Sequence, residues 1–396
     1  MNTDDELDRR FSEKSAWREA RTPWNLAVAA LRDAATPHWD LTQTNPTDAE
    51  LPYPVEALME IARQTSALPY DPAPLGTASA RRSLVDRLAA GHDPDDVCLA
   101  ASTSELYRFL LDLLCDAGDN ILVPAPGYPL FDMIGDLNGV ELRFYPLLEA
   151  DGWSIDLDAL EAAVDSRTRA IIVVTPNNPT GSCIDHEWPA LIELCLAQQL
   201  TLISDEVFAP YRFRPTDGGS LLDAAGAEQI LHVALGGLSK YAALPGHKLS
   251  WAFVGGPTAL RRTAMRRLET IADTFLSPSS SVQAALPALL DLAPEMQRAI
   301  RGRCLENLSQ MESLAATSAV TPLRPTGGWS ALLKMPRILD DEAWGVRLLT
   351  EARVVLQPGS LYRFGGPGFL VASLLTPTER WREGMSRISA VVDRFG

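Results

Sequence analysis

The chain has 396 residues, 46% hydrophobic and 22% charged, a composition typical of a globular protein large enough for two joined domains. Its 51 acidic and 35 basic residues give a formal net charge of −16, which argues against a nucleic-acid backbone or an anionic membrane as partner. The apolar runs fall short of the ~20 residues that span a bilayer, and the acidic start is no secretory signal, so we expect a cytoplasmic protein.

The first two thirds of the chain predict an N-terminal arm and a large domain. Residues 1–45 contain helical patterns, and we expect this arm to pack on a smaller domain or across a dimer interface. Residues 46–290 alternate β-rich runs with amphipathic helices, which predicts a mostly parallel sheet covered on both faces. The expected strands are 119–126, 169–176, 200–208, 230–237 and 249–256, and the expected helices include 104–118 and 186–199.

The pattern changes in the last third. A long helix is predicted over 293–317, followed by an apolar run at 329–336 and a helix near 341–352. Two further apolar runs, "RVVLQPGS" and "FLVASLL", come next. We therefore expect residues 291–396 to form a connecting helix and a smaller α+β domain.

Polar residues follow several of these strands, at the sheet edge where α/β proteins bind ligands. Ser102, Thr103 and Ser104 open a helix and can form an anion cup, although such residues also serve as plain helix caps. Asp205 ends an apolar strand, where a carboxylate must be paired, hydrated or functional. Lys240 follows "ILHVALGGLS", and a desolvated lysine can lose its proton and attack a carbonyl.

Two more residues complete the set. Tyr128 lies in "PAPGYP" and Asn178 in "TPNNPTG", and each alone indicates only packing or turn formation. An anion cup, an aromatic face, an amide, a carboxylate and a reactive amine together suit pyridoxal 5′-phosphate (PLP). The carboxylate would keep the pyridine nitrogen protonated, so that the ring can accept electrons from a carbanion.

With these motifs in order, the chain resembles the class I/II aminotransferases of PLP fold type I, the aspartate aminotransferase-like family. The resemblance extends from about residue 40 to the C-terminus. It implies a large domain with a mostly parallel, seven-stranded-type sheet, a smaller α+β domain, and a homodimer with shared active sites. The motifs that carry it are "STSE", "PAPGYP", "NNPTG", "SDEVF", "SKYAALPGHKLSW", "PTGGWSALL" and "VVLQPGSLYRF".

The resemblance implies a role for each matching residue. Lys240 is the Schiff-base lysine and proton shuttle, and Asp205 pairs with the pyridinium nitrogen. Asn178 bonds the phenolate oxygen of the cofactor, and Tyr128 stacks on its ring. The residues implied to hold the phosphate are Ser102, Thr103, Ser104, Ser239 and Lys248, with Tyr70 reaching it from the partner subunit.

Three positions around the cofactor depart from the family pattern. Lys248 stands where the family has Arg and loses the bidentate fork. Gly237 replaces the first serine of the family's "SxSK" and removes one hydroxyl from the phosphate cup. Phe208 replaces a tyrosine that donates to the phenolate oxygen, which predicts a more basic linkage between lysine and cofactor.

The fourth departure concerns the substrate. Val371 stands on the last strand where the family usually has the arginine that binds the substrate α-carboxylate. Arg363 and Arg21 are candidates to replace that arginine, although either can equally be a surface or structural residue. Alternatively, the amino donor has no carboxylate at this position.

We therefore expect an aminotransferase that moves an amino group from an amino donor to a keto or aldehyde acceptor. The alternative is a PLP enzyme that performs elimination, cyclisation or oxidation of an amino acid in a specialised biosynthetic pathway, which the missing arginine and tyrosine favour. A PLP-binding module without turnover is a third hypothesis, and the retention of Lys240 and Asp205 argues against it. The five dispersed histidines predict no metal site.

Overall fold

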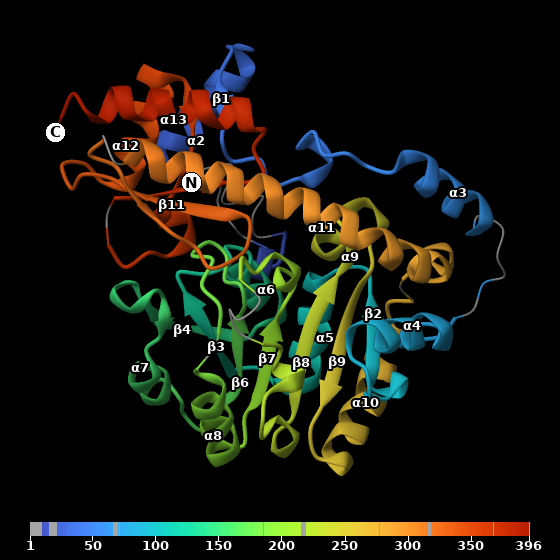
Figure 1. Cartoon of the computed structure of the whole chain (residues 1–396). Coiled ribbons are helices and arrows are strands. Elements are labelled where there is room, and N and C mark those ends of the chain that lie inside the picture. Colours follow the sequence, from blue (N-terminus) through green and yellow to red (C-terminus); the bar gives the residue numbers. More distant parts are fainter. Residues whose placement is uncertain are drawn as a thin grey trace.

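The computed structural model of this chain describes most of its length. The described residues are 10–15, 22–65, 70, 72–184, 186–214, 219–276, 278–315, 318–366 and 368–395. Figure 1 shows a large domain built on one sheet, a small domain above it, and a long helix that runs across the boundary.

The large sheet has eight strands, and its centre is parallel. Strands β8, β7, β6, β3 and β4 run parallel to one another, while β9, β2 and β5 join in antiparallel register. This architecture confirms the predicted α/β fold class. From edge to edge the strands are β2 (Val97–Ala100), β9 (Ser250–Gly255), β8 (His232–Gly237), β7 (Thr201–Asp205), β6 (Thr168–Val174), β3 (Asn120–Ala125), β4 (Glu141–Leu148) and β5 (Ser154–Ile155).

Helices cover both faces of this sheet, which explains why its central strands are almost continuously apolar. Residues of α5 and α10 form one hydrophobic core with the strands, and residues of α4 and α8 form cores on the other face. The helices of the large domain are α3 (Val55–Thr65), α4 (Ala78–Leu88), α5 (Thr103–Leu114), α6 (Phe131–Asn138), α7 (Leu157–Ala162), α8 (Trp188–Gln198), α9 (Leu238–Tyr241) and α10 (Thr258–Asp273).

Helix α11 (Ser280–Ala315) connects the two domains (Figure 1). Leu286 and Leu289 near its start are buried in a core of the large domain, whereas Ile300 and Leu308 are buried in the core of the small domain. The expected start at residue 293 is wrong, because the helix continues through two internal prolines. Proline favours a helix start in sequence, but here a buried apolar face on both sides of the prolines maintains the helix.

The small domain is built on a second sheet in the order β10-β11-β14-β13. The N-terminal arm packs on it, since Val28 and Leu31 of α2 are buried against Leu349 and Val355. This is one of the two placements expected for the arm, while the domain boundaries at residues 45 and 290 stay predictions. The elements of the small domain are β10 (Thr321–Leu323), β11 (Ser330–Lys334), β13 (Gln357–Pro358), β14 (Phe369–Ser373), α12 (Asp341–Arg347) and α13 (Thr378–Val392). The arm contributes α2 (Pro23–Asp33) and β1 (Trp39–Asp40), and β1 pairs with β12 (Val354–Val355).

None of the helices in the described part of the chain has the length and apolar character needed to cross a membrane.

Candidate active site

A cavity of about 360 Å³ opens where the parallel strands end and the small domain begins. Most of the residues singled out from the sequence lie around it. Its lining consists of Thr44, Ser102, Thr103, Tyr128, Pro129, Leu130, Val174, Asn178, Asp205, Val207, Phe208, Gly237, Ser239, Lys240, Ser250, Trp329, Ser330, Gln357 and Tyr362.

Lys240 lies in the short helix α9, directly after strand β8. The Tyr211 hydroxyl donates a hydrogen bond of 2.7 Å to the Lys240 carbonyl and so fixes this turn. The Lys240 Nζ lies 4.8 Å from the ring centroid of Trp329 and 5.6 Å from that of Phe208. Burial lowers the pKa of Lys240 to about 8, against an opposing effect of Asp205. A substantial share of neutral amine is therefore present near physiological pH, as a nucleophile requires.

Asp205 ends strand β7 with its carboxylate buried. The Tyr107 hydroxyl donates to Asp205 Oδ2 at 2.7 Å, and the Val207 N–H donates to Oδ1 at 3.1 Å. Burial raises the pKa of the carboxyl, while these two hydrogen bonds and Lys240 act in the opposite direction. Tyr107 was missed in the sequence, because it lies on the apolar face of α5. The available signal was a buried phenol, which needs a hydrogen-bond partner.

The anion cup forms at the N-terminus of α5. Ser102 is the N-cap and accepts a hydrogen bond from the Glu105 N–H at 3.1 Å, while the Glu105 carboxylate accepts from the Ala101 N–H at 2.6 Å. Ser102 and Thr103 line the cavity, and Ser104 does not. The positive end of the α5 dipole therefore points to the same space as these two hydroxyls.

The two glycines of "LGGLSK" make room for the neighbouring strand. A Cβ on Gly236 would lie 2.3 Å from the indole nitrogen of Trp251, and a Cβ on Gly237 would lie 2.4 Å from Ser250 Oγ. In the antiparallel β8–β9 pair, Gly236 faces Trp251 and Gly237 faces Ser250. Because successive residues of a strand point to opposite faces, Ser250 is directed to the cavity of Lys240 and Trp251 to the other side.

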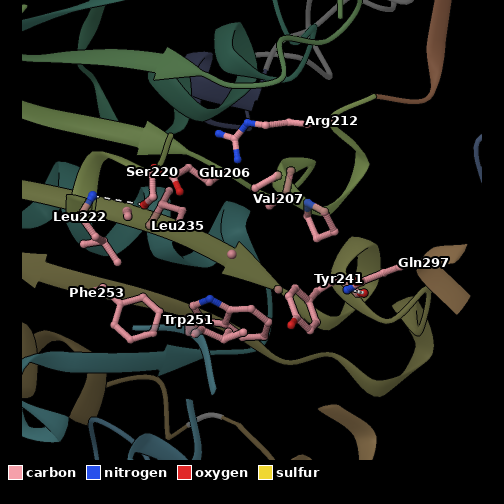
Figure 2. Close-up of a pocket in the computed structure, with 16 residues that line it drawn as sticks. Glu206, Val207, Arg212, Ser220, Leu222, Leu235, Tyr241, Trp251, Phe253 and Gln297 are labelled. Carbon is pink, nitrogen blue, oxygen red and sulfur yellow. Dashed lines mark hydrogen bonds between the residues drawn. The ribbon is translucent and has the colours of Figure 1, made fainter. Parts of the chain in front are cut away.

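Figure 2 shows that other side, where Trp251, Tyr241 and Phe253 line a second cavity of about 290 Å³. Glu206 also lines it, and its carboxylate accepts hydrogen bonds of 2.9 Å from the Ser204 hydroxyl and from the Leu221 N–H. These bonds give Glu206 a structural task. Lys240 does not line the second cavity, so the first cavity is the candidate active site.

The remaining cavity residues come from loops and from the small domain. Asn178 Oδ1 accepts a long hydrogen bond of 3.4 Å from the Ser330 hydroxyl, which joins the two domains at the cavity. The Tyr128 ring contacts Phe131 edge to face at 5.7 Å. The Phe208 ring lies edge to face with Trp329 at 5.3 Å, so the two aromatic rings near Lys240 support each other.

Val371 on β14 is buried and packs with Leu332 and Tyr362. Its register partner on β13 is Gln357, whose Oε1 accepts a hydrogen bond of 2.5 Å from the Tyr362 hydroxyl. Gln357 and Tyr362 line the cavity, and Val371 does not. A neutral amide–phenol pair therefore faces the cavity next to Val371.

The suggestion that Arg363 replaces the missing arginine is wrong. Its guanidinium pairs with Asp132 of α6 at 2.9 Å and lies 4.1 Å from the ring centroid of Phe144. Arg363 does not line the cavity, because this acidic and aromatic pair holds it outside. The other candidate, Arg21, lies outside the described residues.

Besides Ser104, two residues predicted to reach the phosphate do not line the cavity in this single chain. Lys248 is exposed, at a turn where its φ of 49° is left-handed. Tyr70 is 66% exposed, and its predicted contact requires a partner subunit.

The donor set of the cavity fits PLP. Hydroxyls at a helix N-terminus suit a phosphate, and an aromatic face and an amide suit a substituted pyridine. The buried carboxylate of Asp205 suits a protonated ring nitrogen, and the amine of Lys240 suits an aldehyde. Among the described residues, no three histidines, cysteines or carboxylates lie close enough to hold a metal ion.

Comparison with known proteins agrees with this assignment. The chain matches the family described as aminotransferase class I and II over residues 38–388. It is 30% identical over 311 residues to an alanine aminotransferase of Mycobacterium tuberculosis, covering 74% of this chain and 71% of the relative. It is 28% identical over 321 residues to an S-alkyl-thiohydroximate lyase of Arabidopsis thaliana, covering 77% of this chain and 68% of the relative. The solved alanine aminotransferase of Pyrococcus furiosus has a TM-score of 0.85 and 23% identity, covering 97% of this chain and 100% of that one, and shows the shared fold.

Proposed function

We propose that this chain, which belongs to the class I and II aminotransferase family, uses an amino donor whose amine-bearing carbon carries a neutral polar group and no carboxylate. As a member of that family it is a PLP-dependent aminotransferase, which moves an amino group from an amino donor to a keto acceptor. When bound, PLP supplies the electron sink that makes the proton on the substrate's amine-bearing carbon acidic.

The proposed task of Lys240 is proton transfer. With a pKa of about 8, its Nζ can take a proton from the substrate carbon and release it again near neutral pH. The rings of Phe208 and Trp329 lie beside Nζ and keep water away from the transferred proton.

Asp205 is proposed to hold the proton at the ring nitrogen of the cofactor. That task needs an ionised carboxylate, which burial opposes. The hydrogen bonds from Tyr107 and from the Val207 N–H support the ionised form. Asn178 would donate to the phenolate oxygen and Tyr128 would stack on the ring, while Ser102, Thr103 and Ser239 would hold the phosphate.

The observation that carries the substrate proposal is the neutral wall at Gln357 and Tyr362. Among the described residues that line the cavity, Lys240 is the one cation, and it is assigned to the chemistry. Because the Tyr362 hydroxyl donates to Gln357 Oε1, the amide NH₂ of Gln357 remains to donate to a substrate. A carboxylate there would be buried without a counter-charge, which costs several kcal/mol, whereas a hydroxyl or amide would be satisfied.

The test compares three donors with one side chain, such as leucine, leucinol and isopentylamine. We expect the amino alcohol to have the highest kcat/KM, by about tenfold over the amino acid, because it alone offers Gln357 an uncharged acceptor. A preference for the amino acid would contradict the proposal. The Arg21→Met variant would then show whether that residue supplies the cation.

The alternative of elimination, cyclisation or oxidation is not favoured, since the family description and the relative from M. tuberculosis both name transamination. Three further proposals remain. The protein is a homodimer in which Tyr70 reaches the phosphate site of the partner subunit, and it is cytoplasmic. The chain is divided into an arm over 1–45 and domains over 46–290 and 291–396. The packing of α2 on the small domain supports the placement of the arm, and the family resemblance supports the homodimer.

A further inference from the structure

Ser250 opens strand β9, and its side chain lines the candidate active site. Ser250 is 2% exposed, and it lines the cavity together with Ser102, Thr103 and Ser239. Among the described residues its hydroxyl has no hydrogen-bond partner. Its oxygen is not one of the fully buried, unpaired polar atoms of the described residues, so it is open to the cavity and can donate a hydrogen bond to a ligand there.

The location of this hydroxyl relative to Gly237 indicates which part of a ligand it meets. Gly237 and Ser250 form a cross-strand pair, and a Cβ on Gly237 would lie 2.4 Å from Ser250 Oγ and 3.1 Å from Ser250 Cβ. Ser250 therefore fills the space that a side chain at position 237 would need. That position is where the motif "SxSK" places a phosphate-binding serine and this chain has glycine.

We propose that Ser250 binds the phosphate of PLP and supplies, from the neighbouring strand, the hydroxyl that Gly237 lacks. The inference rests on the proposed cofactor site and adds a residue to it. Ser250 Oγ would donate its proton to a phosphate oxygen, which provides the missing partner. Strand β9 is paired on both edges, by β2 and by β8, so the backbone that carries this side chain is held in place before the cofactor binds.

The geometry also predicts that the two positions can be exchanged only together. Gly237→Ser alone brings a Cβ to within 2.4 Å of Ser250 Oγ, which is closer than the two atoms can approach. Ser250→Gly removes the obstructing atom, so the double variant Gly237→Ser/Ser250→Gly would present one hydroxyl from β8 instead of β9.

The experiment measures binding of PLP and of pyridoxal, which lacks the phosphate, to the apoprotein by quenching of tryptophan fluorescence. We expect Ser250→Ala to raise the Kd for PLP by about tenfold or more and to leave the Kd for pyridoxal unchanged. Gly237→Ser should also weaken PLP binding, and the double variant should recover an affinity close to that of the wild type. Ser83→Ala, which truncates a buried serine of α4 outside the cavity, is the matched control.

Each outcome bears on the inference. Equal Kd values for PLP in the wild type and in Ser250→Ala would overturn it, as would an equal loss for PLP and pyridoxal, which would indicate general disruption. A double variant that binds PLP no better than Gly237→Ser would contradict the exchange. A wild-type protein that binds neither ligand would overturn the proposed cofactor site itself, which distinguishes the two failures.

Discussion

The Tyr107 hydroxyl donates a 2.7 Å hydrogen bond to the carboxylate of Asp205, and both residues are buried beneath the candidate active site. They come from different elements, α5 and β7, whose packing brings them together. We propose that Tyr107 is a positioning residue, which acts through Asp205. Its proposed role is to support the ionised form of the carboxylate, because its hydrogen bond lowers the pKa of Asp205 while burial raises it.

The first prediction removes that hydrogen bond. Tyr107→Phe takes away a donor to the charged form of Asp205, so the pKa of the carboxyl should rise further. As the pH is lowered, Asp205 then becomes protonated at a higher pH than in the wild type. The acid limb of the kcat–pH profile should therefore shift to higher pH, and kcat should fall by about tenfold where the carboxyl is partly protonated. Steady-state kinetics across the acid range checks this.

Tyr145→Phe is the matched control for Tyr107→Phe. Tyr145 is equally buried and donates a 2.7 Å hydrogen bond to the Ile172 carbonyl, away from the cavity. It should lose stability without any change in the acid limb. If both variants keep the wild-type profile, Tyr107 has only a packing role.

The second prediction concerns Phe208, which lines the cavity beside Lys240. Phe208→Tyr introduces a hydroxyl that can donate to the phenolate oxygen of the cofactor. This donor should lower the pKa of the visible absorbance transition of the holoenzyme, because it stabilises the deprotonated form. A spectroscopic pH titration measures it. Phe213→Tyr, on the core of the small domain, should leave the transition where it is, and a variant Phe208→Tyr with no downward shift would refute the prediction.

The third prediction follows from the lowered pKa of Lys240. The pKa of this amine is about 8 in the folded apoprotein and 10.5 in the unfolded chain. Between these two pH values the unfolded state therefore binds more protons than the folded state. The free energy of unfolding should therefore rise with pH across this window, by up to roughly 3 kcal/mol. In Lys240→Met this rise disappears.

Urea unfolding of the two apoproteins across that pH range measures the difference. The advantage of Lys240→Met should be greatest below about pH 8 and shrink as the pH increases. Lys248→Met, at an exposed lysine, should follow the wild-type pH dependence. A constant difference between Lys240→Met and the wild type would show that the amine is not shifted.

The fourth prediction tests the neutral wall of the cavity. Val371→Arg places a cation next to Gln357 and Tyr362, and the ratio of kcat/KM for an amino acid to that for its amino alcohol should rise by about tenfold or more. Because Val371 is buried, some loss of stability is also expected. Val371→Met adds length without charge and should leave the ratio unchanged. A folded, PLP-binding Val371→Arg with the wild-type ratio would argue against carboxylate recognition at this position.

The sequence sufficed to predict the fold wherever burial was continuous. The central strands are covered on both faces and therefore appear as apolar runs, which is why β6, β7, β8 and β9 were predicted within a few residues. Strand β4 near the sheet edge was not predicted, because it is only partly buried and its pattern is mixed. Several polar lining residues come at or just after strand ends, at the sheet edge where ligands bind. Their order along the chain therefore indicated the site before the structure was known: Ser102, Thr103, Asn178, Asp205 and Lys240.

The missed residues depend on tertiary contacts that no local pattern encodes. Ser250 lies within an apolar strand, and only the β8–β9 register shows that it faces Gly237. Tyr107 resembles any core residue of an amphipathic helix until Asp205 is placed beside it. Arg363 was misjudged because its partner, Asp132, lies far away in the sequence on α6.

The most direct test of the central claim is a half-reaction of the holoenzyme, followed by absorbance and by analysis of the released cofactor. Addition of an amino alcohol should convert bound PLP to pyridoxamine 5′-phosphate with one equivalent of carbonyl product, and a keto acid should then restore PLP. Lys240→Met should bind PLP without this conversion, since it lacks the amine that we propose moves the proton. Release of ammonia with the cofactor remaining as PLP would contradict transamination and establish lyase chemistry instead.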